Sequence, residues 1–490
     1  MKKLFIYISI FFMLLVPVFS QQQPVFEEYF TDHTMRIDYY HTGDSTQEFI
    51  AIDKMYKQGA WAGNPNYLID HLNNGRYYIK VYDIKSGTLI FSKGFDSYFG
   101  EYKTTGLAIK GIKRTFHETA LIPYPKNKIR FRIEIRDRKN QLHSLFERKI
   151  QPDSLEIHRE SLTGGVKVFE ILKNGPPHHK VDLAIIAEGY TKKETDKLKA
   201  DLNRIKQIFF QQEPYKRFQD RFNINGVFKP SQQIGCDEPR RLIFKNTSIG
   251  SSFNSLGSER YLLTEDNRAL RDIAAHVPYD ALIIMINSKR YGGGGIYNFY
   301  CTFTTDNQWH PYLLLHEFGH SFTGLADEYY TSSTAYNDFY PKGVEPLEPN
   351  ITALVNIENL KWKNLLSKKI QIPTSWEKQD FDQMQSEYQA KRKKINNKIA
   401  RMSRRGIPNA KIKKIQKESE RLSKENARRV NGFLKQSRFN GKVGAFQGAG
   451  YSSEGLYRPM VDCIMFTRGK KPYCRVCESA IVQIIKIYTE

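Results

Sequence analysis

The first third of the chain carries short runs in which apolar and polar side chains alternate. Residues 77–84 and 129–135 both show this pattern, and turn residues such as Lys85-Ser86-Gly87 separate the runs. Alternation with a period of two is typical of strands with one buried face. We therefore predict an N-terminal β-sandwich over residues 21–160.

The pattern changes after this predicted sandwich. Three strongly apolar runs, at residues 181–187, 222–228 and 279–286, have the length and composition of buried strands. Thr191 is a suitable N-cap for a helix between the first two runs. Because strands separated by helices indicate a mixed sheet, we predict an α+β or α/β domain over residues 161–490.

One highly charged segment interrupts this second domain. Between residues 376 and 440, apolar side chains recur at helical spacing on both sides of a break at Gly406-Ile407-Pro408-Asn409. This pattern predicts an inserted helical hairpin whose charged faces are exposed to water. A docking arm for an acidic partner is the alternative, but a run of charges is more often a solvated face.

The first residues have the pattern of an export signal. Lys2 and Lys3 precede an almost unbroken apolar run at residues 4–18, and small side chains favour cleavage after Ser20. A membrane anchor is the alternative, but the run is shorter than the ~20 residues of a membrane span. We expect residues 1–20 to be a signal peptide. The mature protein would then be secreted, periplasmic or held at the cell surface, without a transmembrane span.

The charge of the chain raises the question of nucleic-acid binding. The formal net charge of the 490 residues is +23, and strongly basic chains often bind polyanions. Much of the positive charge lies between Lys391 and Arg429, inside the predicted hairpin. This uneven distribution and the predicted export both argue against a nucleic-acid partner. An acidic polymer or a cell surface remains an alternative partner.

Five cysteines follow the predicted signal peptide, and an exported protein can retain disulfides. Cys474 and Cys477 form a CxxC pair, whereas a structural zinc site needs two further ligands and the chain has no second CxxC. We therefore predict a disulfide between Cys463 and either Cys474 or Cys477. The odd number leaves at least one thiol free or bonded between chains.

The strongest chemical signal is the run His316-Glu317-Phe318-Gly319-His320, which follows three leucines. On a helix, His316 and His320 lie on one face and can bind a single cation. Imidazole nitrogens suit zinc, and Glu317 is angled toward the open side of the metal, where a base can take a proton from water. Buried histidines in such a pair are costly without a metal. We predict one catalytic Zn2+ with Glu317 as general base.

A third protein ligand is expected shortly after this helix, because catalytic zinc sites keep one position open for water. Gly324 can end the helix with a positive φ. The chain can then return Asp327 or Glu328 to the metal. Asp327 is the favoured ligand because its short side chain fits a tight return. Glu328 is either an alternative ligand or a partner that orients a histidine.

The run from His316 to Tyr330, HEFGHSFTGLADEYY, resembles the active-site segment of the bacterial IgA metallopeptidase family, which is similar to the metzincins. The resemblance covers about residues 165–490, and the preceding β-rich segment is similar to the N-terminal domain of that family. It implies a metzincin-like zinc peptidase fold with a mixed sheet. The chain departs from the metzincin motifs HExxHxxGxxH and HExxHxxGxxD by one extra residue before the glycine.

The same resemblance implies roles for residues outside the motif. Met465 matches the methionine turn beneath the zinc of metzincins, and Met460 is a weaker candidate. Tyr457 or Arg458 would stabilise the oxyanion, with Tyr451 as an alternative. An ordinary packing role is the alternative for each of these side chains.

Gly293 and Gly294 belong to a glycine run between a predicted strand and the metal helix. In a metzincin-like fold, an edge strand near this point would bind extended substrate. We expect a secreted zinc metalloendopeptidase that cleaves a protein or glycoprotein, with immunoglobulin or mucin substrates suggested by the family. The alternatives are a zinc-dependent amidase or deacylase on a cell-wall or glycan polymer, and a non-catalytic surface binding protein with structural zinc.

Overall fold

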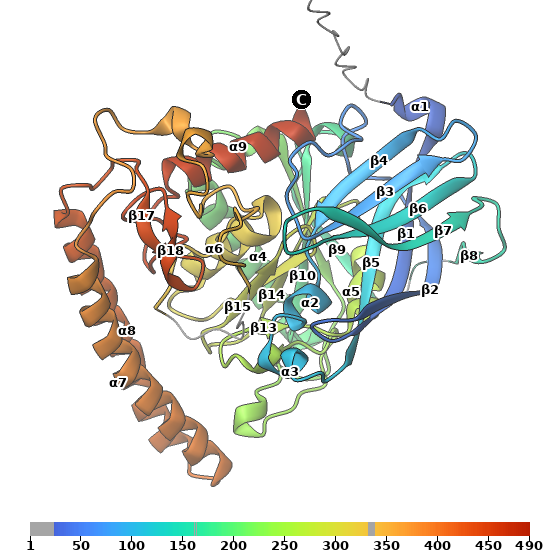
Figure 1. Cartoon of the computed structure of the whole chain (residues 1–490). Helices are drawn as coiled ribbons and strands as arrows, with labels where there is room; N and C mark the ends of the chain where they lie inside the picture. The colour runs from blue at the N-terminus through green and yellow to red at the C-terminus, as the bar shows by residue number, and fades with distance from the viewer. Residues whose placement is uncertain (1–23, 161, 163, 332–338) are drawn as a thin grey trace, which may run out of the picture.

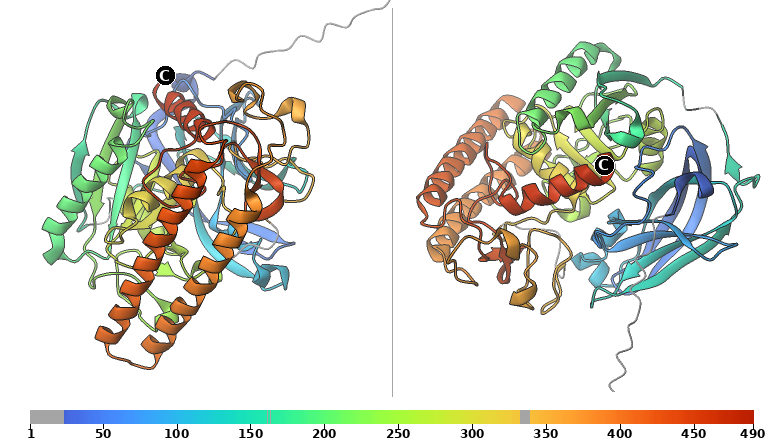
Figure 2. Two further views of the ribbon diagram at one scale, coloured as in Figure 1. Left: turned by 90° about the vertical axis from the view of Figure 1, so that its left-hand side faces the viewer. Right: turned by 90° about the horizontal axis from the view of Figure 1, so that it is seen from above.

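The computed structural model describes residues 24–160, 162, 164–331 and 339–490. The predicted signal peptide lies outside this part of the chain. Figure 1 shows a β-rich N-terminal domain on one side of a central α/β domain and a long helical hairpin on its other side, and the views in Figure 2 agree. No helix of the described residues combines the length and the hydropathy needed to cross a bilayer.

The N-terminal domain consists of two four-stranded sheets that share one core. Met35 and Ile37 from the first sheet form a buried cluster with Val81 and Phe131 from the second sheet, as in a β-sandwich. The strand orders are β5-β1-β2-β8 and β4-β3-β6-β7. The strands are β1 (Phe30–Gly43), β2 (Glu48–Gln58), β3 (Tyr77–Asp83), β4 (Leu89–Phe95), β5 (Arg114–Pro125), β6 (Ile129–Arg136), β7 (Leu142–Ile150) and β8 (Ile157–His158), and the short helices are α1 (Phe26–Tyr29), α2 (Tyr98–Tyr102) and α3 (Gly106–Ile109).

The central domain is built on a six-stranded mixed sheet with the order β15-β16-β14-β10-β11-β9. The four inner strands run parallel, and the two edge strands run antiparallel to their neighbours. The apolar run predicted at residues 181–187 is β10, in which every residue is buried. The strands are β9 (Lys167–Leu172), β10 (Val181–Glu188), β11 (Phe222–Phe228), β14 (Ala281–Ile286), β15 (Gly293–Ile296) and β16 (Tyr300–Thr304).

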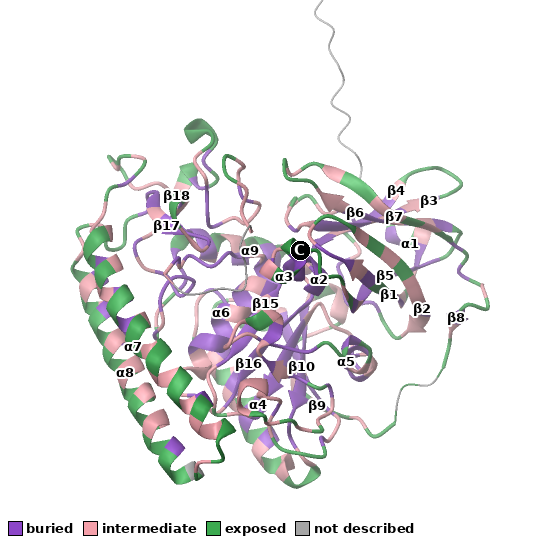
Figure 3. Ribbon diagram, turned by 60° about the horizontal axis from the view of Figure 1, so that its bottom comes forward, coloured by how far each residue is buried: buried purple, intermediate pink, exposed green. Residues whose placement is uncertain are grey.

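The two faces of this sheet are covered by different parts of the chain. Leu202, Leu314 and Ile481, from three helices, share one core with the first face. A fourth helix and aromatic side chains of the N-terminal domain, including Phe99, share a core with the second face. Figure 3 shows the buried sheet between these layers. The helices are α4 (Thr195–Phe210), α6 (His310–Thr323) and α9 (Arg475–Thr489) on the first face and α5 (Asn267–Ala274) on the second.

The predicted helical hairpin is present as α7 (Lys378–Arg404) and α8 (Asn409–Gln436). Gly406 has a φ of 66° in the turn between them, a conformation that glycine adopts without strain. Exposed and half-buried positions make up most of both helices (Figure 3), in agreement with the charge pattern. Trp309 donates a hydrogen bond from Nε1 to Ser423 Oγ at 3.1 Å, which connects α8 to the start of the metal-motif helix.

Two small hairpin sheets complete the central domain. Thr191 forms a capping box with Glu194 in the turn that precedes α4, so the predicted N-cap residue closes this turn and the helix proper starts at Thr195. The mixed α/β architecture with a β-rich N-terminal domain is confirmed, whereas its likeness to metzincins stays a prediction. The remaining strands are β12 (Ser252–Phe253), β13 (Leu262–Leu263), β17 (Phe446–Ala449) and β18 (Ser452–Arg458).

Candidate active site

The helix α6 carries the histidine motif into the middle of the molecule. Leu314 and Phe318 are fully buried in the core beneath the sheet, so the opposite side of the helix faces a cleft. Gly324 ends the helix with a φ of 68°, and its N–H donates to His320 O at 2.9 Å. Leu325 N–H then donates to Gly319 O at 3.2 Å, which is the hydrogen-bond pattern of a glycine-capped helix end. The predicted C-cap is confirmed.

Three potential ligand atoms converge after this bend. His316 Nε2 and His320 Nε2 lie 3.2 Å apart, and Asp327 Oδ1 lies 3.0 Å from the first and 3.3 Å from the second. Asp327 Oδ1 is buried and has no hydrogen-bond partner among the described residues. Two imidazoles and a carboxylate with an unsatisfied buried oxygen are a donor set that fits a zinc ion.

The other ring nitrogen of each histidine is held by a backbone carbonyl. His316 Nδ1 lies 3.1 Å from Ile464 O, and His320 Nδ1 lies 2.5 Å from Leu325 O. A carbonyl only accepts hydrogen bonds, so each Nδ1 carries a proton and donates it. In its neutral form each ring then directs the Nε2 lone pair toward the shared point, which is the arrangement that binds a metal.

The charges in this group are strongly coupled. Burial lowers the pKa of His320, but the Asp327 carboxylate outweighs this effect and raises the pKa to about 9. Burial acts to raise the pKa of Asp327, yet the two histidines hold it well below its usual range. For Glu317, burial prevails and raises the pKa, although the histidines oppose the shift. The aspartate is therefore an anion, whereas the glutamate has an increased affinity for a proton.

Glu317 lies against the edge strand β15, where glycine allows a close approach. A Cβ on Gly293 would lie 2.9 Å from Glu317 Cγ, and a Cβ on Gly295 would lie 2.4 Å from Glu317 O. Gly294 faces the opposite side of the strand, toward Tyr261, because successive residues of a strand alternate in direction. The predicted substrate role of Gly293 and Gly294 is thus corrected in part, since Gly293 borders the cleft and Gly294 does not.

The outer edge of β15 is partly covered by the loop that contains Arg260 and Tyr261. Gly293 N–H donates to Arg260 O at 3.3 Å, and Tyr261 forms an isolated bridge with Gly293. Any extended substrate would therefore have to pair with the remaining part of the strand. The histidine cleft itself has a volume of about 100 Å3. Its lining includes Arg260, Tyr291, Gly293, Gly295, His316, Glu317, His320, Asp327, Tyr329, Tyr340 and Tyr451.

Tyr451 provides a hydroxyl that contacts one of the predicted ligands. Its Oη donates to Asp327 Oδ2 at 2.7 Å, so one carboxylate oxygen is fixed while the other faces the histidines. Tyr457 and Arg458, which the family resemblance favours, do not line this cleft. Tyr451 has a φ of 65° in the tight turn that joins β17 to β18, and this turn brings it back over the site.

Arg458 is positioned for packing rather than for contact with substrate. It is fully buried, it donates from Nη1 to Gly448 O at 2.7 Å, and its guanidinium lies 3.8 Å from the ring centroid of Phe466. The expectation that it stabilises an oxyanion is therefore wrong. Arg458 is the last residue of β18. Its side chain points to the buried side of that strand, because successive side chains of a strand alternate in direction.

Sequence reasoning missed Arg260 and Tyr329. Arg260 donates from Nη2 to Tyr329 Oη at 2.6 Å, and both side chains line the cleft. Arg260 comes from a loop without any periodic pattern, so the sequence contains no signal for it. Tyr329 follows the predicted ligands directly and was within the family-like segment.

Met465 lies beneath the motif helix. It is fully buried, and a Cβ on Gly319 would lie 3.1 Å from its sulfur. Its carbonyl accepts from Glu328 N–H at 2.9 Å, next to the Ile464 carbonyl that holds His316. Met460 is half-buried at the border of the same core. The role of Met465 as a methionine turn stays a prediction.

Glu328 points away from the histidines. Its Oε1 accepts from Asn350 Nδ2 at 3.1 Å and lies 3.2 Å from Cys477 Sγ, and the residue does not line the cleft. It is therefore neither a third ligand nor a partner of a histidine at this site. All five cysteines remain as thiols. The disulfide predicted for Cys463 is not formed, since its sulfur lies 3.8 Å from that of Cys477 and a disulfide requires about 2.05 Å.

A larger cavity of about 540 Å3 lies between the N-terminal domain and the central domain. Trp61 and Phe91 line it from one side, and Tyr297 and Tyr488 line it from the other. It contains neither of the motif histidines. The smaller cleft is the better candidate for chemistry because the convergent ionisable groups lie there.

Comparison with known families agrees with this geometry. A family model described as IgA Peptidase M64 matches residues 169–485, and a model described as Peptidase M64 N-terminus matches residues 25–147. No curated protein matches the chain. The first match spans well over half of the sequence and contains His316, Glu317, His320 and Asp327. The chain therefore belongs to the IgA peptidase M64 family of metallopeptidases and carries the N-terminal domain of that family.

Proposed function

We propose that the protein is an exported zinc metalloendopeptidase in which His316, His320 and Asp327 hold one catalytic Zn2+. The observation that carries this proposal is the convergence of two imidazole Nε2 atoms on the unpartnered Asp327 Oδ1. Three protein ligands leave a coordination position open, as catalysis requires. A zinc ion bound here supplies Lewis acidity, which acidifies water and polarises a peptide carbonyl.

Glu317 is the proposed general base. Its carboxylate lies between the histidines and β15, and burial raises its pKa, which makes it a better proton acceptor at neutral pH. It takes one proton from the attacking water and later delivers that proton to the amide nitrogen as the C–N bond breaks. The second proton of the water ends on the new carboxyl group or in solvent, so one water is consumed for each bond cleaved.

Arg260, Tyr329 and Tyr451 are the groups best placed to orient the substrate. Their polar ends meet in the cleft beside Asp327 and Glu317. Among them, Arg260 and Tyr329 are the donors that can stabilise the negative charge on the carbonyl oxygen, because the single hydroxyl proton of Tyr451 is donated to Asp327. Arg260 is well suited to this role because its hydrogen bond to Tyr329 already fixes the guanidinium, which therefore needs little reorganisation when substrate binds.

The proposed substrate is a protein or glycoprotein outside the cytoplasm. The predicted signal peptide at residues 1–20 supports secretion, periplasmic location or display at the cell surface. The family description points to immunoglobulin A, and mucin-type glycoproteins are the second class to examine. The narrow cleft suits an extended peptide chain better than a folded domain.

The test is cleavage of immunoglobulin A, a mucin and a broad peptide library by the full mature chain, read by mass spectrometry. We expect cleavage that a chelator abolishes and zinc restores. Glu317→Gln should retain the bound zinc but lower turnover by at least about 100-fold. Glu425→Gln, on the exposed face of α8, is the matched control and should cleave normally. Normal turnover in Glu317→Gln would contradict the proposal.

A further inference from the structure

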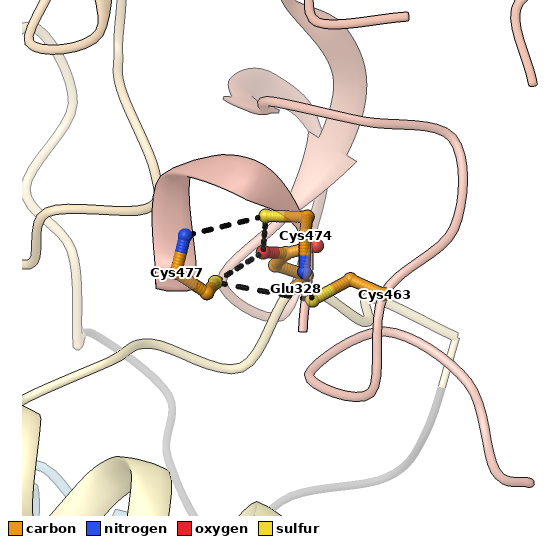
Figure 4. A group of neighbouring side chains, drawn as sticks. All are labelled: Glu328, Cys463, Cys474 and Cys477. Carbon is orange, nitrogen blue, oxygen red and sulfur yellow. Dashed lines mark hydrogen bonds between the residues drawn. The ribbon is translucent and has the colours of Figure 1, made fainter. Parts of the chain in front are cut away.

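A second group of potential ligands lies on the other side of the segment that carries Asp327. Cys463, Cys474, Cys477 and Glu328 are all buried, and their ligand atoms all lie within 4.8 Å of one another. Figure 4 shows the four side chains directed toward a common point, with Cys474 and Cys477 at the start of α9. None of them contributes to the histidine cleft.

The distances match tetrahedral coordination. Sulfur–zinc bonds of about 2.3 Å place two sulfurs of one tetrahedral site about 3.8 Å apart. Cys463 Sγ and Cys477 Sγ are 3.8 Å apart. A carboxylate oxygen on the same ion would lie about 3.6 Å from each sulfur, and Glu328 Oε1 lies 3.2 Å from Cys477 Sγ and 3.8 Å from Cys474 Sγ.

Backbone amides are already directed at the sulfurs. Met465 N–H and Cys474 N–H donate to Cys463 Sγ at 3.4 and 3.2 Å, and Cys477 N–H donates to Cys474 Sγ at 3.4 Å. A neutral thiol is a weak acceptor, whereas hydrogen bonds to an ionised acceptor are stronger. These amides therefore favour the thiolate form that binds a metal.

The carboxylate also indicates a missing cation. Glu328 is fully buried, and its Oε2 has no hydrogen-bond partner within the described chain. An unpaired buried carboxylate is costly, and a nearby metal ion would remove that cost. By contrast, a third cluster of potential ligands contains Asp38 and Asp53, but these carboxylates are already paired with Arg36 and Arg268.

We propose that Cys463, Cys474, Cys477 and Glu328 bind a second zinc ion, which is structural. Thiolates select soft or borderline metals such as zinc, and four protein ligands leave no position for water or substrate. Binding releases the thiol protons to solvent. The three thiolates, the carboxylate and Zn2+ together carry two negative charges, and the buried guanidinium of Arg458 is close enough to interact with Glu328.

This second ion would hold together the chain segments that position the proposed catalytic ligands. It connects the segment after Gly324, the segment at Cys463 and the first turn of α9. The first of these segments positions Asp327, and the second supplies the Ile464 carbonyl that orients His316. Loss of the ion would loosen both connections without removing any ligand of the catalytic metal.

The test is zinc content and X-ray absorption of the full mature chain, with the His316→Ala/His320→Ala and Cys474→Ser/Cys477→Ser variants. We expect each double variant to bind half the zinc of the wild type. The histidine variant should retain zinc with sulfur neighbours at about 2.3 Å, and the cysteine variant should retain zinc with nitrogen and oxygen neighbours only. Cys236→Ser, which changes a buried cysteine outside the cluster, should bind as much zinc as the wild type.

The wild-type spectrum keeps the test decisive if a double variant fails to fold. Zinc without sulfur neighbours in the wild type would overturn the proposal. An intact mass lowered by the hydrogens of a Cys463 disulfide would overturn it as well. Sulfur-bound zinc together with an empty histidine site would support this inference and contradict the proposed catalytic function, so the two proposals can fail separately.

Discussion

The histidine cleft and the cysteine cluster lie on opposite sides of one short segment, and they use neighbouring carboxylates differently. Asp327 contacts both imidazoles, and the group lines an open cleft together with Glu317. Glu328 joins three sulfurs in a fully buried group with no access for substrate. An open site with three protein ligands is suited to catalysis, whereas a closed site with four is suited to stability. Because Asp327 and Glu328 are adjacent in the chain, the proposed structural site would fix the position of a ligand of the proposed catalytic site.

The comparison is tested most strongly by Asp327→Asn and Glu328→Gln, which make the same chemical change at adjacent positions. Asp327→Asn removes a ligand from the open site, so peptidase activity should fall by at least about 100-fold, more than loss of an outer-shell partner costs. Glu328→Gln should lower the melting temperature by at least about 2–4 °C and reduce activity far less. Turnover, zinc content and thermal unfolding are measured side by side. The reverse pattern would exchange the assignments of the two carboxylates.

Tyr451→Phe tests how the open site holds its aspartate. The change removes the hydroxyl that donates to Asp327 Oδ2 at 2.7 Å. We expect zinc affinity to fall by about 10–100-fold, as for other partners of metal ligands, with partial recovery of activity in excess zinc. Tyr457→Phe is the matched control because this tyrosine does not line the cleft. An equal loss of affinity in the control would show that the effect does not come from the hydrogen bond to Asp327.

Gly293→Ala separates the position of the base from metal binding. The added Cβ would lie 2.9 Å from Glu317 Cγ and 2.8 Å from Thr302 O, so the carboxylate or the strand has to move. We expect kcat to fall by about tenfold, because small displacements of a catalytic group are costly, while the zinc content stays constant. Gly432→Ala is the control, since its Cβ meets open space on α8. An unchanged kcat would show that Glu317 tolerates the displacement.

The parts that could be predicted from the sequence depend on contacts between near neighbours. His316 and His320 share a face because of helical spacing, and Gly324 reverses the chain toward Asp327 over a few residues. The strands and the hairpin were predicted for the same reason, since their periodic patterns are local. The family resemblance extended this reasoning to the identity of the family, which the matched models confirm.

The parts that were missed depend on distant segments. Glu328 meets the cysteines only because the chain packs α9 beneath the motif helix, so the absence of a second CxxC gave no hint of a fourth ligand. Arg458 was expected at the cleft, but it lies on the inward-facing side of β18, and its side chain packs in the core against Phe466. Arg260 reaches the cleft from a loop with no periodic signal. In each case a tertiary contact determines the role of the side chain.

The N-terminal domain offers a buried histidine that is satisfied by carboxylates and needs no metal. His41 Nδ1 lies 3.0 Å from Glu118 Oε2, and His41 Nε2 lies 2.9 Å from Glu48 Oε2. Burial lowers the pKa of His41, but Glu118 and Glu48 outweigh this effect and raise it above the usual value. The charged form is therefore stabilised by folding. His41 has a carboxylate at each ring nitrogen, whereas the motif histidines have a backbone carbonyl at Nδ1 and face each other through Nε2.

His41→Gln should consequently change stability and its pH dependence but not catalysis. Because the folded-state pKa of His41 exceeds the unfolded value of about 6.5, its stabilising effect is complete below that pH and is lost as the pH rises through the folded-state pKa. The variant should lose about 2 kcal/mol of unfolding free energy in mildly acidic buffer, and the difference from the wild type should shrink in alkaline buffer. Denaturant titrations across this range measure it. A difference that stays constant with pH would mean that His41 is neutral in the folded protein, and the contrast with the motif histidines would then rest on geometry alone.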